Sequence, residues 1–153
     1  MKLSSALNIN INNIRIREFT MAGQKLRVRV PLASEMEEIT KAVDNADWQK
    51  KYSEMAAPFL RDKSEIQGEE IKFLDDDIVV DGRSIKELSI LTAKTEERIT
   101  QMIRLLVPAN ESDDMNTINY SDIEEAFPFA VQMELMKKII EVISPGYEET
   151  RKN

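Results

Sequence analysis

Carboxylates are the most abundant side chains in this sequence that could perform chemistry. The 153 residues include 28 acidic side chains but no histidine and no cysteine. Histidine is the commonest general base and metal ligand, and a cysteine thiolate is a common nucleophile, so an active site would depend on carboxylates, lysine, tyrosine or serine. Adjacent acidic pairs such as Glu124 and Glu125 point apart on a helix, which favours surface charge over a shared catalytic site.

The densest acidic run, Asp75–Asp77, does not match the pattern of a calcium-binding loop. An EF-hand loop starting at Asp77 needs an oxygen ligand two residues later and a bidentate glutamate eleven residues later. The sequence has Val79 and Leu88 there. The run is therefore interpreted as a solvated turn. The four glycines are isolated from one another, so no phosphate-binding loop is predicted either. We expect no metal, no cofactor and no enzymatic activity.

Charge is divided unevenly along the chain. Residues 1–31 contain six basic side chains and one acidic, whereas the remainder contains 15 basic and 27 acidic. Opposite signs on the two parts favour contact with a partner or with a second copy, so a homo-oligomer is expected. Four arginines are the candidate contacts: Arg15, Arg17, Arg27 and Arg29. With Phe19 they could instead hold a nucleic-acid strand, although a sequence pI near 4.8 disfavours that alternative.

Apolar and charged residues alternate on both sides of Met21–Gln24. Ile14 and Ile16 alternate with arginines before this segment, and Leu26, Val28 and Val30 alternate with basic residues after it. This period of two, with a glycine between the runs, predicts an N-terminal β-hairpin with one apolar and one cationic face. Residues 1–32 are therefore predicted to form an arm.

The longest amphipathic stretch extends from residue 84 to residue 106. Ser84 and Glu87 have the spacing of a capping box, and Pro108 follows the stretch. Apolar or small residues recur every three or four positions, which predicts one helix with a single packed face. That face comprises Ile85, Leu88, Leu91 or Thr92, Thr95, Ile99, Met102, Ile103 and Leu106.

Further helices are predicted on both sides of this stretch. The pair Ser34 and Glu37 opens one helix, which breaks near Asp44–Asp47, restarts at Asp47 and ends at Pro58. Trp48 and Tyr52 lie four residues apart on it and are interpreted as core packing, with a ligand platform as the alternative. Residues 71–74 and 78–82 form a second short hairpin around the acidic turn.

The C-terminal part begins with a polar stretch, residues 108–120, which is interpreted as a linker. Ser121 and Glu124 form a third capping-box pair, Pro128 lies in the first turn of the last helix, and residues 144–146 end that helix. The predicted fold class is α+β and mainly α-helical, with two hairpins and three to four amphipathic helices. Residues 33–146 are the helical body, and residues 147–153 are a flexible tail.

Several apolar helix positions are candidates for binding a partner. The chain has eight methionines, a residue type favoured on surfaces that accept varied helices, although ordinary core filling is the alternative. The candidates are Ile99, Met102, Leu106, Phe129, Leu135, Met136 and Ile139. No apolar run approaches the ~18 residues of a membrane helix and the N-terminus is unlike a signal peptide, so a cytosolic protein without membrane contact is expected.

The C-terminal part resembles a family of phage proteins. Residues 121–128, SDIEEAFP, the helix with Val131, Leu135 and Ile139, and the ending ISPGY at 143–147 resemble tail assembly chaperones of long-tailed bacteriophages. The arm through residues 27–31, RVRVP, and the turn at 81–83 before the long helix follow the same order. The resemblance covers most of the chain as a general pattern.

The resemblance implies a non-catalytic protein of the host cytoplasm. Such chaperones bind and solubilise the tape-measure protein and help to recruit tail-tube subunits. Two alternatives remain open. One is a structural tail-completion or connector protein, in which the opposite charges of arm and body join neighbouring copies. The other is a regulatory nucleic-acid-binding protein that uses the cationic hairpin.

Overall fold

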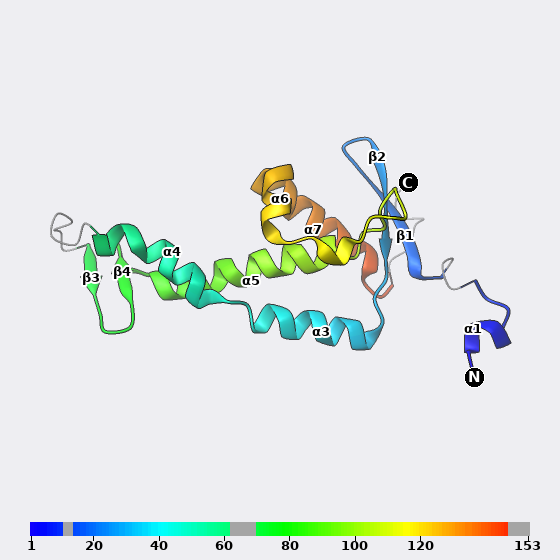
Figure 1. Cartoon of the computed structure of the whole chain (residues 1–153), viewed down its shortest axis with the longest axis horizontal. Helices are drawn as coiled ribbons and strands as arrows, with labels where there is room; N and C mark the ends of the chain where they lie inside the picture. The colour runs from blue at the N-terminus through cyan, green and yellow to red at the C-terminus, as the bar shows by residue number, and fades with distance from the viewer. Residues whose placement is uncertain (11–13, 62–69, 147–153) are drawn as a thin grey trace. The chain divides into compact units, whose positions relative to one another are not determined.

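The computed structural model describes residues 1–10, 14–61 and 70–146, and the predicted tail at 147–153 lies outside them. The described residues form two compact units. Unit 1 combines residues 1–39 with residues from 98 onward, and unit 2 comprises residues 40–97. This grouping differs from the expected arm of 1–32 and body of 33–146, because the hairpin shares a core with the C-terminal helices. The mixed α+β, mainly helical class is confirmed (Figure 1).

The N-terminal hairpin in unit 1 is confirmed. β1 (Ile16–Met21) pairs antiparallel with β2 (Gln24–Arg29), after a short helix α1 (Leu3–Ala6). The connecting residues Ala22 and Gly23 have φ of 52° and 76°. Positive φ at both central positions fits a type I′ turn, whose twist matches that of the two strands.

The predicted division of the hairpin into an apolar and a cationic face is wrong. Arg17 pairs with Val28, and Phe19 pairs with Leu26, so Arg17 lies on the core-facing side. Ile16 instead pairs with Arg29 on the opposite face. Sequence alternation defines the faces of each strand separately, whereas the turn sets the register that joins them.

The long helix is confirmed as α5 (Ile85–Ile103), but its end was predicted too late. Leu106 is in a β-bridge with Val28 rather than on the helix. The Arg29 amide donates to the Leu105 carbonyl at 2.8 Å, and the Val107 amide donates to the Arg27 carbonyl at 2.9 Å. The chain after α5 therefore extends along β2, which satisfies the outer edge of that strand.

The packed face of α5 also differs from the prediction. Leu88 and Leu91 are 43% and 64% exposed, whereas Ser89 and Ala93 are buried. The Ser89 hydroxyl donates to the Ile85 carbonyl at 2.7 Å, so its burial leaves no unpaired donor. In unit 2 small side chains take the core positions, and two leucines that the apolar pattern placed in the core face solvent.

Two helices meet at a corner in the C-terminal part of unit 1. α6 (Tyr120–Ala126) and α7 (Phe129–Ile143) are separated by Phe127 and Pro128. A break at Pro128 was predicted, but Pro128 is the N-cap of α7 rather than a residue of its first turn. The third capping box lies two residues earlier than predicted. The Asn119 side chain accepts from the Asp122 amide, and the Asp122 side chain accepts from the Asn119 amide. Asparagine and aspartate accept the two backbone hydrogen bonds of a capping box as serine and glutamate would.

The segment interpreted as a linker packs against the core of unit 1. It contains a 3₁₀ helix, η1 (Met115–Thr117), capped by the Asp114 side chain. Met115, Ile118 and Tyr120 pack against the core, and the Arg104 side chain donates to the Ile118 carbonyl at 2.9 Å. Its polar composition therefore reflects turns and caps rather than a freely moving connection.

Unit 2 is built around α4 (Trp48–Arg61), the first part of α5 and a small sheet. α4 follows α3 (Ala33–Asp44) after a break, and the Lys50 amide donates to the Asp47 side chain at 3.1 Å, as expected for a restart there. The Trp48 and Tyr52 rings meet edge to face, with 6.5 Å between their centroids. Tyr52 packs against the core of this unit, as predicted for this residue.

Two predicted helix boundaries in this region are wrong. Pro58 lies inside α4, which continues to Arg61, so the proline removes one amide donor near the end of the helix without ending it there. Ser34 lies inside α3, which begins at Ala33. The Glu35 carboxylate accepts from the Leu32 amide at 3.4 Å at this end of the helix.

The second hairpin carries a third strand that the sequence did not indicate. β3 (Ile71–Phe73), β4 (Ile78–Val80) and β5 (Arg83–Ser84) form an antiparallel sheet, with a turn of positive φ at Asp81 and Gly82. Asp77 anchors it to α5, since its carboxylate accepts from the Ser84 hydroxyl and from the Lys86 amide. Ser84 in turn accepts from the Glu87 amide at 3.0 Å, which is half of the predicted capping box.

Ile99 tests the core of unit 1, since its side chain is 0% exposed. Replacing Ile99 with Asp should lower the free energy of unfolding by several kcal/mol, because an unpaired carboxylate would be buried. Arg98→Asp, at the neighbouring exposed position, should have a much smaller effect. Thermal unfolding followed by far-UV circular dichroism would measure both, and equal melting temperatures would contradict the assigned core.

Candidate interaction surface

The largest apolar side chains exposed on the C-terminal helices gather at the start and along one line of α7. We call Phe127, Phe129, Met133 and Ile140 the α7 flank. Phe129 is 55% exposed, and the other three are between 36% and 38% exposed. Steps of four and seven residues keep helix positions within about 40° of one another, so Phe129, Met133 and Ile140 share one line.

The flank exists because α7 is apolar over more of its circumference than the core can cover. Leu135, Ile139 and Val142 are buried in the core of unit 1. The flank lies beside this buried face, and residues 120–146 as a whole contain five acidic and two basic side chains. A broad apolar face with one uncovered edge and a polar surround is typical of a protein interaction surface.

The corner that presents the two phenylalanines is held by a buried amide. Gln132 is 1% exposed, yet both ends of its side chain are paired. Its Oε1 accepts from the Tyr120 hydroxyl at 2.7 Å, and its Nε2 donates to the Phe127 carbonyl at 3.0 Å. A fully satisfied buried network gives a defined geometry, so Phe127 is held in place at the corner. Sequence reasoning missed Gln132, because a lone glutamine on an apolar face carries no motif.

The predicted apolar binding residues lie mostly in the core. Ile99 and Met102 at the end of α5 are buried, as are Leu135, Met136 and Ile139 on α7. Leu106 is half-buried beside β2, whereas Phe129 is exposed. In this structure Phe129 is therefore the member of this set whose side chain is most accessible to a partner.

Three of the four candidate arginines make contacts within unit 1. Glu35 on α3 accepts from Arg15 at 2.8 Å and from Arg29 at 2.5 Å. Arg17 donates to the carbonyls of Val142 and Ser144, at 2.5 and 3.2 Å. The cationic side chains predicted to contact a partner thus largely hold the hairpin in place, and Arg27 is the exposed one of the four.

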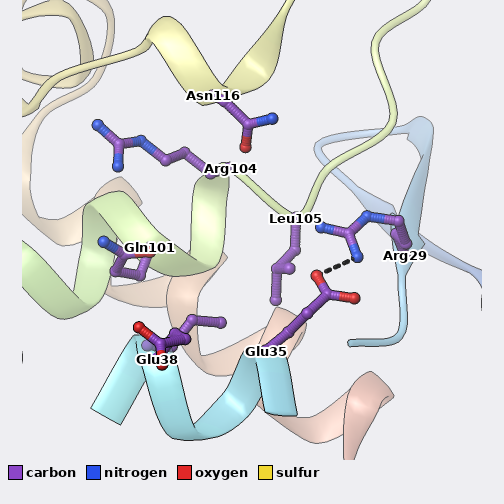
Figure 2. Close-up of a pocket in the computed structure, with 8 residues that line it drawn as sticks. Arg29, Glu35, Glu38, Gln101, Arg104, Leu105 and Asn116 are labelled. Atoms are coloured by element: carbon purple, nitrogen blue, oxygen red, sulfur yellow. Dashed lines mark hydrogen bonds and ion pairs between the residues drawn. The ribbon is translucent and has the colours of Figure 1, made fainter. Parts of the chain in front are cut away.

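A pocket of about 300 Å³ lies beside the Glu35 contact. Figure 2 shows Glu35 paired directly with Arg29 in one part of the lining, while Arg104 and Asn116 line another part of the pocket. Two arginines and two glutamates are among the lining residues, so the lining carries no net charge that would favour an anionic or a cationic ligand.

Burial raises the pKa of the Glu35 carboxyl, but the other influences outweigh it. Hydrogen bonds from Arg29, the Leu32 amide and Arg15, with the positive charge of Arg29, leave the pKa below its ordinary value. A carboxylate that is held ionised in this way ties α3 to the open end of the hairpin, through Arg15 before β1 and Arg29 at the end of β2.

Among the described residues, no three or more acidic side chains gather as a metal site would require. Asp77 is instead an anchor for local hydrogen bonds, and the absence of metal dependence stays a prediction. Within the same residues no helix combines the length and the apolar character needed to cross a membrane.

No protein-family model, no curated protein and no solved structure matches this chain.

The Glu35 contact predicts a pH dependence. Because its folded pKa is lowered, Glu35 stabilises unit 1 above its ordinary pKa of 4.5, and this contribution is lost as pH falls through the folded pKa. Glu35→Gln should cost roughly 1 kcal/mol at neutral pH, a value reduced for solvent screening. The difference in the free energy of unfolding between the variant and wild type should disappear in acid.

Urea unfolding followed by circular dichroism at neutral pH and near pH 3 would measure this gap. Glu37→Gln is the matched control, since Glu37 is an exposed carboxylate on the same helix. A gap of equal size at both pH values, or an equal loss in the control, would contradict the role given to Glu35.

Proposed function

We propose that this protein is a non-catalytic assembly chaperone that binds an apolar helical segment of a client through the α7 flank. The observation that carries the proposal is the exposure of Phe127, Phe129, Met133 and Ile140 beside a packed core. An amphipathic client helix places anchors at steps of three, four and seven residues, which is the spacing that a flank along one helix can accept.

The resemblance to tail assembly chaperones suggests the client. We propose the tape-measure protein, a long chain that needs a soluble partner before the tail forms around it, with recruitment of tail-tube subunits as a second step in the host cytoplasm. The net charge of −7 supports this role, because a charged surface keeps a complex with an apolar client in solution.

A structural connector joined by arm-to-body charge is the less favoured proposal. It needs arginines that reach a neighbouring copy, whereas Arg15, Arg17 and Arg29 are engaged within unit 1. The same contacts weaken the nucleic-acid alternative, since a phosphate would have to compete with Glu35 and with helix carbonyls.

Co-expression with the tape-measure protein of the same phage would test the proposal. Wild-type chaperone should keep the client in the soluble fraction and elute with it. Phe129→Glu and Met133→Glu should abolish both effects, because a carboxylate on the flank would be desolvated by the client helix. Soluble client with either variant would overturn the assignment of the flank.

Ala130→Glu provides the matched control. Ala130 is exposed on α7 and lies about 100° around the helix from Phe129, outside the line of the flank, and it receives the same carboxylate. This variant should solubilise the client as well as wild type does. Failure of all three variants alike would show an effect of charge on α7 rather than of the flank.

A further inference from the structure

A second exposed apolar surface lies on α5, within unit 2. Leu88 and Leu91 are 43% and 64% exposed, and Thr95 continues the same line after a step of four. Ile85, Ser89 and Ala93 occupy the buried face of the same helix. The stripe of Leu88, Leu91 and Thr95 is therefore directed away from the core that α5 shares with α4.

Charges of opposite sign border this stripe on one side. Glu87 and Lys94 are seven residues apart, so they lie within about 20° of each other around the helix. Glu87 directly precedes Leu88, and Lys94 directly precedes Thr95, which are equivalent positions one heptad apart. In paired helices such flanking positions form the interhelical salt bridges that set partner and orientation.

We propose that the α5 stripe binds the α5 stripe of a second copy of this chain, with the two helices antiparallel. In this arrangement Leu88 of each copy packs against Leu91 of the other. Glu87 of each copy then lies beside Lys94 of the other, so that the two-fold axis generates two equivalent ion pairs. A parallel pair would put the Glu87 and Lys94 flanks of the two copies on opposite sides of the interface, so that Glu87 would face Thr92 of the partner and no Glu87–Lys94 pair would form.

Charge complementarity selects a second copy over a foreign helix. The charged pair and the two leucines are complementary to themselves under a two-fold rotation, which is the requirement of an isologous interface. The stripe is also shorter than the α7 flank, so its contact area is at the small end for protein interfaces. The dimer is therefore weak and depends on protein concentration.

Sedimentation equilibrium from about 1 µM to about 1 mM would measure the association. Wild type should pass from monomer to dimer, and Leu91→Asp should remain monomeric. Glu87→Lys alone and Lys94→Glu alone should each weaken the dimer about tenfold, since each creates two like-charge pairs. The double variant Glu87→Lys with Lys94→Glu should regain wild-type affinity.

Lys72→Glu is the control, because it changes an exposed charge of unit 2 outside α5. It should dimerise as wild type does. Trp48 is the single tryptophan and lies in unit 2, so its fluorescence would report whether each variant retains the fold. A monomer throughout this concentration range, or a double variant no better than the single ones, would overturn the proposal.

Cross-linking would test the orientation, and the absence of native cysteine makes it unambiguous. A mixture of Leu88→Cys and Leu91→Cys proteins should oxidise mainly to the mixed disulfide. Preferential disulfides within each single-variant preparation would show a parallel pair and would contradict the antiparallel arrangement.

Discussion

The fold of unit 1 depends on one cation at the end of one helix. Arg17 projects from the core-facing side of β1 and donates to the carbonyls of Val142 and Ser144. The last carbonyls of a helix lack partners within it and carry the negative end of the helix dipole. The guanidinium group of Arg17 donates hydrogen bonds to these carbonyls and places a positive charge at the negative end of the dipole. The hairpin is therefore joined to the end of α7 by charge. Val28 and Ile139, which belong to one core cluster, join the same two elements by packing.

This use of cations changes how the uneven charge of the sequence is understood. The basic N-terminal part and the acidic remainder complement each other within a single chain, through Arg17 at α7 and through Arg15 and Arg29 at Glu35. Two exposed apolar surfaces remain, the α7 flank on unit 1 and the leucine stripe of α5 on unit 2. We propose the first as the contact for a client and the second as the contact for another copy.

Element types could be predicted because their signals are local. Alternation on both sides of Met21–Gln24 predicted the hairpin. Apolar residues at steps of three and four predicted the long helix, and Pro128 predicted the break before α7. Helix boundaries were predicted less accurately where a neighbouring side chain can cap the helix equally well. Asn119 and Asp122 form the capping box in place of the predicted Ser121 and Glu124. Two-residue β5 and the pairing of Leu106 with Val28 carry no periodic signal, so they were missed.

The sequence by itself determined the fold class and most of the helices and strands, because periodicity, caps and turns act over a few residues. Tertiary structure alone decided which apolar residues are accessible. Leu88 and Ile99 belong to the same amphipathic pattern, yet the first faces solvent and the second is fully buried. The reason is that burial depends on what packs opposite each position, and the elements that meet there come from distant parts of the chain.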